Sequence, residues 1–143
     1  MRRRPALHLR VAALILGLAS AWACGLGHPR PVGILVITLD TTRADHLGCY
    51  GDASAMTPNL DALAKEGVRF DQAMAAVPVT LPSHATMFTG LYPPTHGVRY
   101  NGMFRLGDAS MTIAERLREA GFATGAVPAA YPVNAKSGLS QGF

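Results

Sequence analysis

Two apolar runs without helical spacing predict buried strands, and a third run predicts a short one. Residues 33–39 form a nearly continuous run of aliphatic and β-branched side chains, and residues 122–127 form a second apolar run. Such runs are typical of strands that are buried on both faces, as in a parallel sheet covered by helices. Residues 68–75 alternate weakly between apolar and polar positions, which predicts a short strand.

Helix signals lie between these runs. In residues 57–67, Thr57 is placed to cap a helix, Pro58 fits the first helical position and Gly67 fits the end. Residues 112–121 begin with the capping-box sequence Thr-Ile-Ala-Glu and end at a glycine. A third helix is predicted over residues 82–90. The resulting order of strand, helix, helix, helix and strand predicts an α/β layered domain.

A further helix is predicted where a hydroxyl-rich loop meets residues 82–90. Pro82 fits the first helical position, and Gly90 fits the left-handed residue that ends a helix. Thr80 is then expected just ahead of the helix, near free N–H groups and the positive end of the dipole, where a phosphate or sulfate would bind. Its hydroxyl is a candidate nucleophile. The alternative is that Thr80 or Ser83 merely caps the helix.

The net charge of +4 is a local property of the N-terminus. Four of the thirteen Lys and Arg residues lie within residues 1–23, and the remaining nine balance nine Asp and Glu residues. No basic stripe with interleaved aromatic residues remains, so we expect no nucleic-acid partner.

Residues 1–23 predict a secretory signal peptide, because basic residues precede a short apolar run that ends in small residues. This run is short for a membrane span, which needs about 20 apolar residues. Two alternatives stay open: an uncleaved membrane anchor and lipidation at Cys24. Residues 24–32 predict a linker. We therefore expect an exported protein that is periplasmic, secreted or anchored to a membrane.

Asp40 directly follows the first predicted strand, where α/β sheets place their sites. Asp40 and Asp45 could bind a hard cation, although Asp45 fits a solvated loop equally well. Arg43 could pair with an anion or with Asp45. Three histidines have spacings that match no zinc motif: His46, His84 and His96.

Three motifs in order resemble the start of a sulfatase, a family of the alkaline-phosphatase superfamily. They cover residues 37–51, residues 57–64 and residues 80–98, and the resemblance extends over residues 33–143. It implies a three-layer αβα fold with a mostly parallel sheet, present here as its N-terminal part. Residues 137–143 offer no closing element, and a chain with so few strands leaves open sheet edges. We therefore expect a fragment, or a chain that needs a partner.

The resemblance also implies a site. Asp40 matches a metal ligand, and Thr80 matches the nucleophile, which also contacts the metal. His84 stands where an arginine usually steadies the nucleophile and its anion, and Asn101 lies near an asparagine that some phosphonate and phosphodiester hydrolases use. The cofactor would be a divalent cation: calcium, manganese, zinc or magnesium. The family's later ligands would lie beyond Phe143.

Two departures from the family pattern favour phosphoryl chemistry. Sulfatases carry Cys or Ser where Thr80 stands, and these are oxidised to formylglycine, which a threonine cannot form. The usual pair of aspartates is Asp40-Thr41 here. We therefore expect an exported, metal-dependent hydrolase of sulfate or phosphate esters, with phosphodiesters or phosphonates preferred. The alternatives are a phospho-group transferase of the cell envelope and a non-catalytic sulfatase-like protein.

Overall fold

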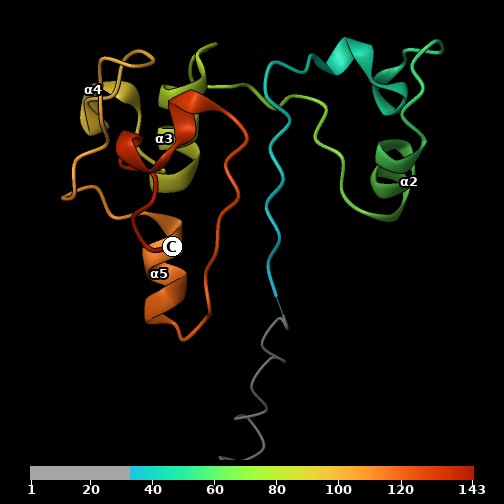
Figure 1. Ribbon diagram of the computed structural model, residues 1–143. Helices are drawn as coiled ribbons and strands as arrows, with labels where there is room; N and C mark the ends of the chain where they lie inside the picture. Colours follow the sequence, from blue (N-terminus) through green and yellow to red (C-terminus); the bar gives the residue numbers. More distant parts are fainter. Residues whose placement is uncertain (1–32) are drawn as a thin grey trace, which may run out of the picture. The chain divides into compact units, whose positions relative to one another are not determined.

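The computed structural model describes residues 33–143 (Figure 1). The expected signal peptide, the linker and Cys24 lie outside the described residues. Within residues 33–143, no helix combines the length and the apolar character that a membrane crossing requires.

Short helices and turns joined by irregular segments make up the described part of the chain (Figure 1). The α-helices are α2 (Pro58–Glu66), α3 (Thr80–Thr89), α4 (Pro93–His96) and α5 (Ile113–Glu119). The 3-10 turns are η1 (Ala44–His46), η2 (Gly48–Tyr50), η3 (Tyr131–Val133) and η4 (Ala135–Ser137). The three helices predicted from the sequence are confirmed, and α4 is an addition. It begins with two prolines, which fit the first turn of a helix.

No strand occurs in residues 33–143, so the predictions of strands at residues 33–39, 68–75 and 122–127 are wrong for this structure. A strand needs a neighbouring backbone to complete its ladder of hydrogen bonds. Residues 33–39 are instead an extended segment whose apolar side chains face solvent, and Leu35 is 82% exposed. The apolar pattern is therefore present, but the pairing that would turn it into a sheet is absent from the part of the chain described.

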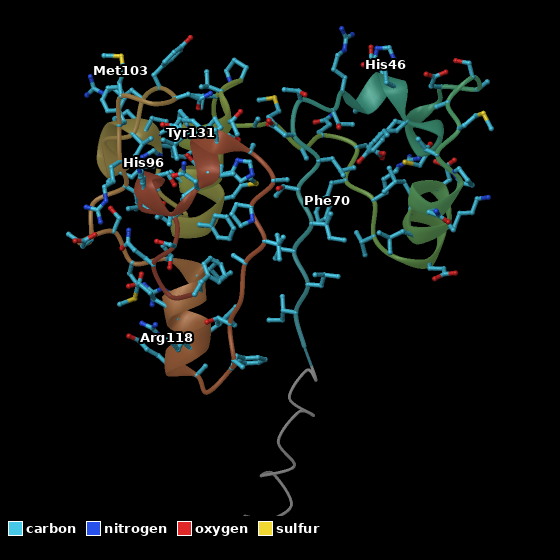
Figure 2. All side chains as sticks on the ribbon, in the orientation of Figure 1. His46, Phe70, His96, Met103, Arg118 and Tyr131 are labelled. Atoms are coloured by element: carbon cyan, nitrogen blue, oxygen red, sulfur yellow. The ribbon has the colours of Figure 1, made fainter. Side chains whose placement is uncertain are left out.

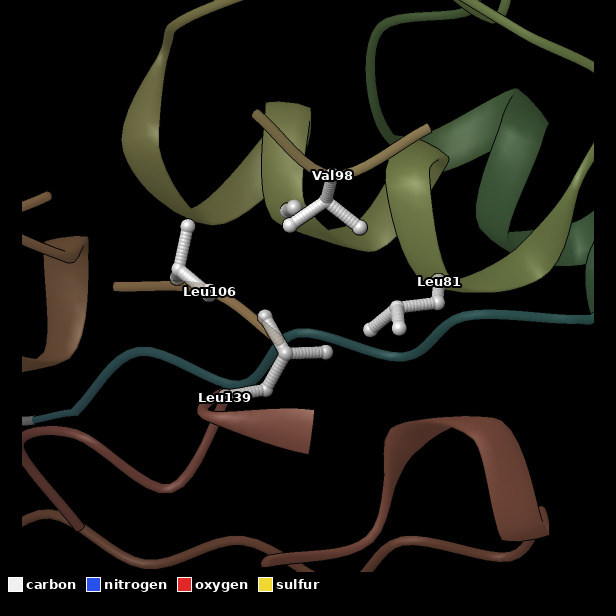
Figure 3. Close-up of a cluster of buried hydrophobic side chains, with 5 residues drawn as sticks. Leu81, Val98, Leu106 and Leu139 are labelled. Atoms are coloured by element: carbon white, nitrogen blue, oxygen red, sulfur yellow. The ribbon is translucent and has the colours of Figure 1, made fainter. Parts of the chain in front are cut away.

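A small hydrophobic core lies beneath α3. It consists of Leu81, Ala85, Val98, Leu106 and Leu139, with Phe88 and Val133 packed against it. Figure 3 shows the four larger labelled side chains of this core, which come from α3, from the segment after α4 and from the segment after η4. Leu81 and Ala85 are one turn apart, so the same face of α3 supplies both. This packing fixes α3 to the C-terminal segments.

The helix ends mostly follow the predicted caps. At α5, the Thr112 hydroxyl accepts a hydrogen bond from the Glu115 N–H, and the Glu115 carboxylate accepts one from the Thr112 N–H, as the capping box predicts. Gly90 ends α3 with a φ of 71°. The start of α3 differs from the prediction: Thr80 is the first helical residue and Pro82 the third. Pro82 is tolerated there because the N–H groups of the first turn have no partner within the helix.

The turn η2 is fastened to α2 by a carboxylate. Asp61 accepts a hydrogen bond from the Cys49 N–H at 2.6 Å, while Thr57 accepts one from the Gly48 N–H at 2.9 Å. The Thr57 hydroxyl also lies 3.2 Å from Asp61. Thr57 occupies the N-cap position as predicted, but its side chain makes no cap bond and binds the turn instead.

We predict that Gly48→Ala destabilises the attachment of η2 to α2. A Cβ atom at Gly48 would lie 2.5 Å from the Asp61 Oδ2 atom. The Asp61 carboxylate is held in place by the hydrogen bonds of its other oxygen, Oδ1. Overpacking of this kind costs about 1–3 kcal/mol of unfolding free energy. Urea unfolding followed by circular dichroism measures the loss. Gly125→Ala is the control, since nothing lies within 4 Å of its Cβ position, and an equal loss in both variants would contradict the prediction.

Candidate functional site

Asp40 and Thr80, forty residues apart in the chain, meet through their side chains. The Thr80 hydroxyl lies 3.4 Å from one Asp40 carboxylate oxygen and 3.3 Å from the other. The hydroxyl oxygen and the two carboxylate oxygens therefore lie together in one small region. Asp40 is exposed and Thr80 is half-buried, so this region is open to solvent. The two residues that the sequence placed at the centre of the site are thus brought together.

The contact depends on a match between two backbone periodicities. Side chains two residues apart in an extended segment point to the same side, which groups Thr38 with Asp40. Side chains four residues apart in a helix share a face, which groups Thr80 with His84. Two residues of extended chain span about 6.6 Å and four residues of helix about 6 Å. Both pairs can therefore meet at once, and both do.

His84 makes the second of these contacts from a buried position, with 9% of its surface exposed. Its Nδ1 atom lies 2.8 Å from the carbonyl oxygen of Thr80, and its Nε2 atom lies 3.1 Å from the Thr38 hydroxyl. Both ring nitrogens are thus engaged by atoms of the chain itself. The structure places His84 behind Thr80, and its expected action on the transferred group stays a prediction.

Asn101 lies at the start of α3, where its side-chain oxygen accepts a hydrogen bond of 2.8 Å from the Leu81 N–H. This bond identifies the oxygen of the amide, because only the oxygen can accept. Within residues 33–143 the Asn101 amide nitrogen has no bonding partner, so its two N–H groups can donate elsewhere. Asn101 is half-buried beside Thr80, which fits the predicted position but leaves its role at a substrate a prediction.

The helix N-terminus offers fewer donors than the sequence suggested. Of the first three helical residues of α3, Leu81 donates its N–H to Asn101 and Pro82 has none. The Thr80 N–H is the group that remains for an anion. The N-cap residue Val79 makes no side-chain cap bond, and the side chain that serves this helix end is Asn101. The alternative in which Thr80 or Ser83 serves as a cap is therefore not observed.

Thr41 adopts a left-handed backbone conformation with a φ of 55°. It is the single non-glycine residue with positive φ among residues 33–143. This conformation is a genuine outlier for a β-branched residue, whereas aspartate enters it more readily. The strained residue directly follows Asp40 and occupies the position of the family's second aspartate.

The donors at this position fit one part of a cation site. Asp40 and Thr80 supply oxygen atoms, the ligands that hard divalent cations prefer. Residues 33–143 contain no group of three or more His, Cys, Asp or Glu side chains placed to hold a metal. The chain as described therefore supplies one carboxylate and one hydroxyl toward such a site.

The remaining polar candidates form separate contacts. Asp45 binds Arg43 with distances of 2.9 and 2.5 Å, and this hydrogen-bonded pairing lowers the pKa of the Asp45 carboxyl. Of the two partners that the sequence left open for Arg43, the structure thus shows Asp45. His46, labelled in Figure 2, lies 3.9 Å from Asp52.

His96 is buried next to α3 (Figure 2). Its Nδ1 atom accepts the Val98 N–H at 3.1 Å, and its Nε2 atom lies 3.1 Å from the Thr86 hydroxyl. Burial lowers the pKa of His96, which favours the neutral ring. A neutral histidine that accepts a backbone N–H supports the fold here and contributes nothing to the Asp40–Thr80 region.

Thr38 was missed when the site was predicted from the sequence. A threonine within an apolar run indicates strand propensity and no chemistry. The available indication was its spacing, because a residue two positions before Asp40 points to the same side of an extended chain. Its partner His84 could be named from the motif, but the hydrogen bond between them depends on tertiary packing.

Comparison with known proteins adds an independent result. The family model described as Sulfatase matches residues 33–138. A steryl-sulfatase from Mus musculus is 38% identical over 135 residues, covering 86% of this chain and 22% of its own length. Arylsulfatase A from Homo sapiens is 39% identical over 114 residues, covering 76% of this chain and 22% of its own. An N-acetylgalactosamine-6-O-sulfatase from Bacteroides thetaiotaomicron is 33% identical over 130 residues, covering 82% and 25%.

The match is extensive for this chain and partial for its relatives. The chain spans about a fifth to a quarter of the length of these curated relatives. No solved structure matches it significantly. The matched region includes Asp40, Thr80, His84 and Asn101, and the family implies an alkaline-phosphatase-like α/β fold. The resemblance inferred from the motifs is thus confirmed: the chain belongs to the sulfatase family.

Proposed function

We propose that this chain contributes the nucleophile and one cation ligand to a metal-dependent hydrolase of sulfuric or phosphoric esters. The observation that carries the proposal is the contact of the Thr80 hydroxyl with both oxygens of Asp40. Membership of the sulfatase family supports the hydrolase class. The same proposal includes the family's three-layer αβα fold for the complete domain and the export of the protein.

Thr80 is the nucleophile in this mechanism. Its Oγ1 atom attacks the phosphorus or sulfur of the ester, its proton is lost to solvent, and the leaving alcohol departs and takes up a proton. Water then attacks the same central atom, releasing the acid and restoring the hydroxyl. The Thr80 N–H and the free amide of Asn101 donate hydrogen bonds to the oxygens of the transferred group, where charge develops.

Asp40 and Thr80 would hold the divalent cation, which when bound lowers the pKa of the hydroxyl and offsets the charge of the transferred group. Asp40 supplies the negative charge that attracts the cation and the oxygens that orient it. The absence of a second carboxylate at Thr41 leaves fewer protein oxygens than in the family's usual pattern. Such a site fits a cation that keeps part of its own hydration shell.

The substrate preference follows from the chemistry of threonine. A formylglycine hydrate can expel sulfate by collapsing to an aldehyde, whereas a threonine ester must be attacked at its central atom. Attack at phosphorus is well served by a cation and oriented donors. We therefore infer a preference for phosphodiesters or phosphonates. Sulfate esters are the second candidate, favoured by the names of the relatives, which are sulfatases.

Two alternative functions compete with the proposed hydrolase. A phospho-group transferase would pass the group from Thr80 to a second alcohol of the cell envelope instead of to water. A non-catalytic relative would keep the fold and lose turnover altogether. The hydrolase releases both the leaving alcohol and the acid, the transferase releases the leaving alcohol without the acid, and the non-catalytic relative releases neither. Measuring both products separates the three.

We predict that Asp40→Asn weakens cation binding by at least about tenfold, since even partners of metal ligands cost 10–100-fold when removed. The change keeps the shape of the side chain and removes its charge. Calorimetric titration with calcium, magnesium, manganese and zinc measures the affinity. Asp45→Asn is the matched control, because Asp45 is an exposed carboxylate that binds Arg43. Equal affinities for wild type and Asp40→Asn would rule out Asp40 as a ligand.

We predict that Thr80→Ala lowers kcat at least about a thousandfold, as removal of a nucleophile does in other hydrolases. Unfolding free energy should change by no more than about 1 kcal/mol, because Thr80 makes no cap bond. Thr80→Ser should keep part of the rate, and Ser83→Ala is the control for an adjacent lost hydroxyl. A panel of chromogenic phosphodiester, phosphonate, phosphomonoester and aryl sulfate substrates measures both rate and preference.

Two results of this panel would contradict separate parts of the account. Full activity of Thr80→Ala would show that the nucleophile is another group. Aryl sulfate as the best substrate would leave Thr80 as nucleophile but refute the inference from threonine to phosphorus.

A further inference from the structure

We propose that Thr38 and His84 are positioning residues that set the Asp40 carboxylate against the Thr80 hydroxyl. The inference rests on the proposed function and assigns a role to a residue, Thr38, that has no direct contact with the reacting atoms. His84 connects the two parts of the site: one ring nitrogen meets the residue that carries the nucleophile, and the other meets the segment that carries Asp40.

The hydrogen bonds of His84 define its protonation pattern. The Thr80 carbonyl can only accept, so Nδ1 carries the proton and donates to it across 2.8 Å. In the neutral ring Nε2 is then an acceptor, and the Thr38 hydroxyl donates to it across 3.1 Å. This hydrogen bond joins the extended segment to α3 at one defined residue, Thr38.

Packing holds the imidazole in the orientation that both bonds require. The ring is stacked on Phe88 with 6.5 Å between centroids and 28° between planes. Phe88 in turn meets Phe143 edge to face at 6.1 Å. His84 is buried, and its neighbour Ala85 belongs to the hydrophobic core that holds α3 in place. The ring is therefore a rigid link, since rotation about its side-chain bonds would break the packing as well as the hydrogen bonds.

The hydrogen bond at Thr38 acts on Asp40, which lies two residues further along the extended segment. Thr38 and Asp40 point to the same side, and the bond at Thr38 fixes which residue of the extended segment faces Thr80. A shift by one residue would bring Leu39 to the helix and turn Asp40 away. Residues 33–39 form no strand among the described residues, so the Thr38–His84 bond takes on the task of fixing this register.

This role differs from direct contact with the substrate. A group that touches the transferred phosphate acts without Thr38, and its loss is independent of the Thr38 hydroxyl. A positioning link fails as a unit, so removal of either end has the same effect as removal of both. The test uses this difference.

The first experiment compares Thr38→Val, which removes the hydroxyl at nearly equal shape, with Thr38→Ser, which keeps it. Calcium and magnesium affinities are measured by calorimetry, and kcat and KM with a chromogenic phosphodiester. Loss of a supporting partner costs 10–100-fold in metal affinity or activity, so Thr38→Val should lose about tenfold in cation affinity and in kcat, with KM unchanged. Thr38→Ser should stay within about twofold of wild type.

Thr42→Val is the matched control. It removes the same hydroxyl on the other side of Asp40, where Thr42 makes a long contact of 3.5 Å with the Asp40 carbonyl oxygen. We expect wild-type affinity and kcat. Equal losses in Thr38→Val and Thr42→Val would overturn the inference, because a general loosening of the segment would then explain both.

A double-mutant cycle adds His84→Phe, which keeps an aromatic ring against Phe88 and removes both nitrogens. The double variant should be no weaker in cation affinity than His84→Phe alone. Additive losses, with Thr38→Val and His84→Phe acting independently, would overturn the link and favour direct contact of His84 with the substrate.

Nitrogen NMR of labelled histidine tests the link without any turnover. His84 should show the Nδ1–H tautomer, and Thr38→Val should shift its Nε2 resonance while Thr42→Val does not. An Nε2–H tautomer, or no shift in Thr38→Val, would overturn the inference whatever the activity. If these NMR results hold in a protein that binds no cation and turns over no ester, the proposed function fails, and the positioning role fails with it.

Discussion

The site depends on the register between an extended segment and one turn of a helix. Thr38 and Asp40 project from one side of the extended chain, His84 and Thr80 from one face of α3, and the two spacings agree within about 1 Å. The Thr38–His84 hydrogen bond and the Asp40–Thr80 contact therefore form together. Neither residue pair is close in sequence, so the register is a product of packing. The proposed chemistry needs this register because a carboxylate turned away from Thr80 could not share a cation with it.

The core explains why the helical side of the register is rigid. Leu81 and Ala85 bury one face of α3, and Gly90 ends the helix in the left-handed conformation. Asn101 then bonds the Leu81 N–H, which ties the chain after α4 to the helix start. The extended side has weaker support. Its apolar side chains face solvent, and Thr41 is held in a conformation that a β-branched residue resists.

Local signals in the sequence predicted the helices, and non-local contacts account for what it missed. Proline at the start of α2, the Thr112–Glu115 capping box and Gly90 are effects of neighbouring residues, so they could be recognised directly. Residues 33–39 have the composition of a buried strand, but pairing depends on another segment, and composition does not supply it. Asp40 and Thr80 were candidates from their positions beside a predicted strand and a predicted helix, and the family motif gave them their expected roles. The role of Thr38 and the bond from Asn101 required the folded chain.

Nuclear Overhauser contacts measured on methyl- and histidine-labelled protein test the central claim most directly. The account predicts contacts from the Thr38 methyl group to the His84 ring and from the Asp40 methylene group to the Thr80 side chain. It predicts none from the Leu39 methyl groups to either helix residue, because Leu39 points to the opposite side of the extended chain. Contacts of Leu39 with His84 or Thr80, in place of those from Thr38 and Asp40, would contradict the register and the site built on it.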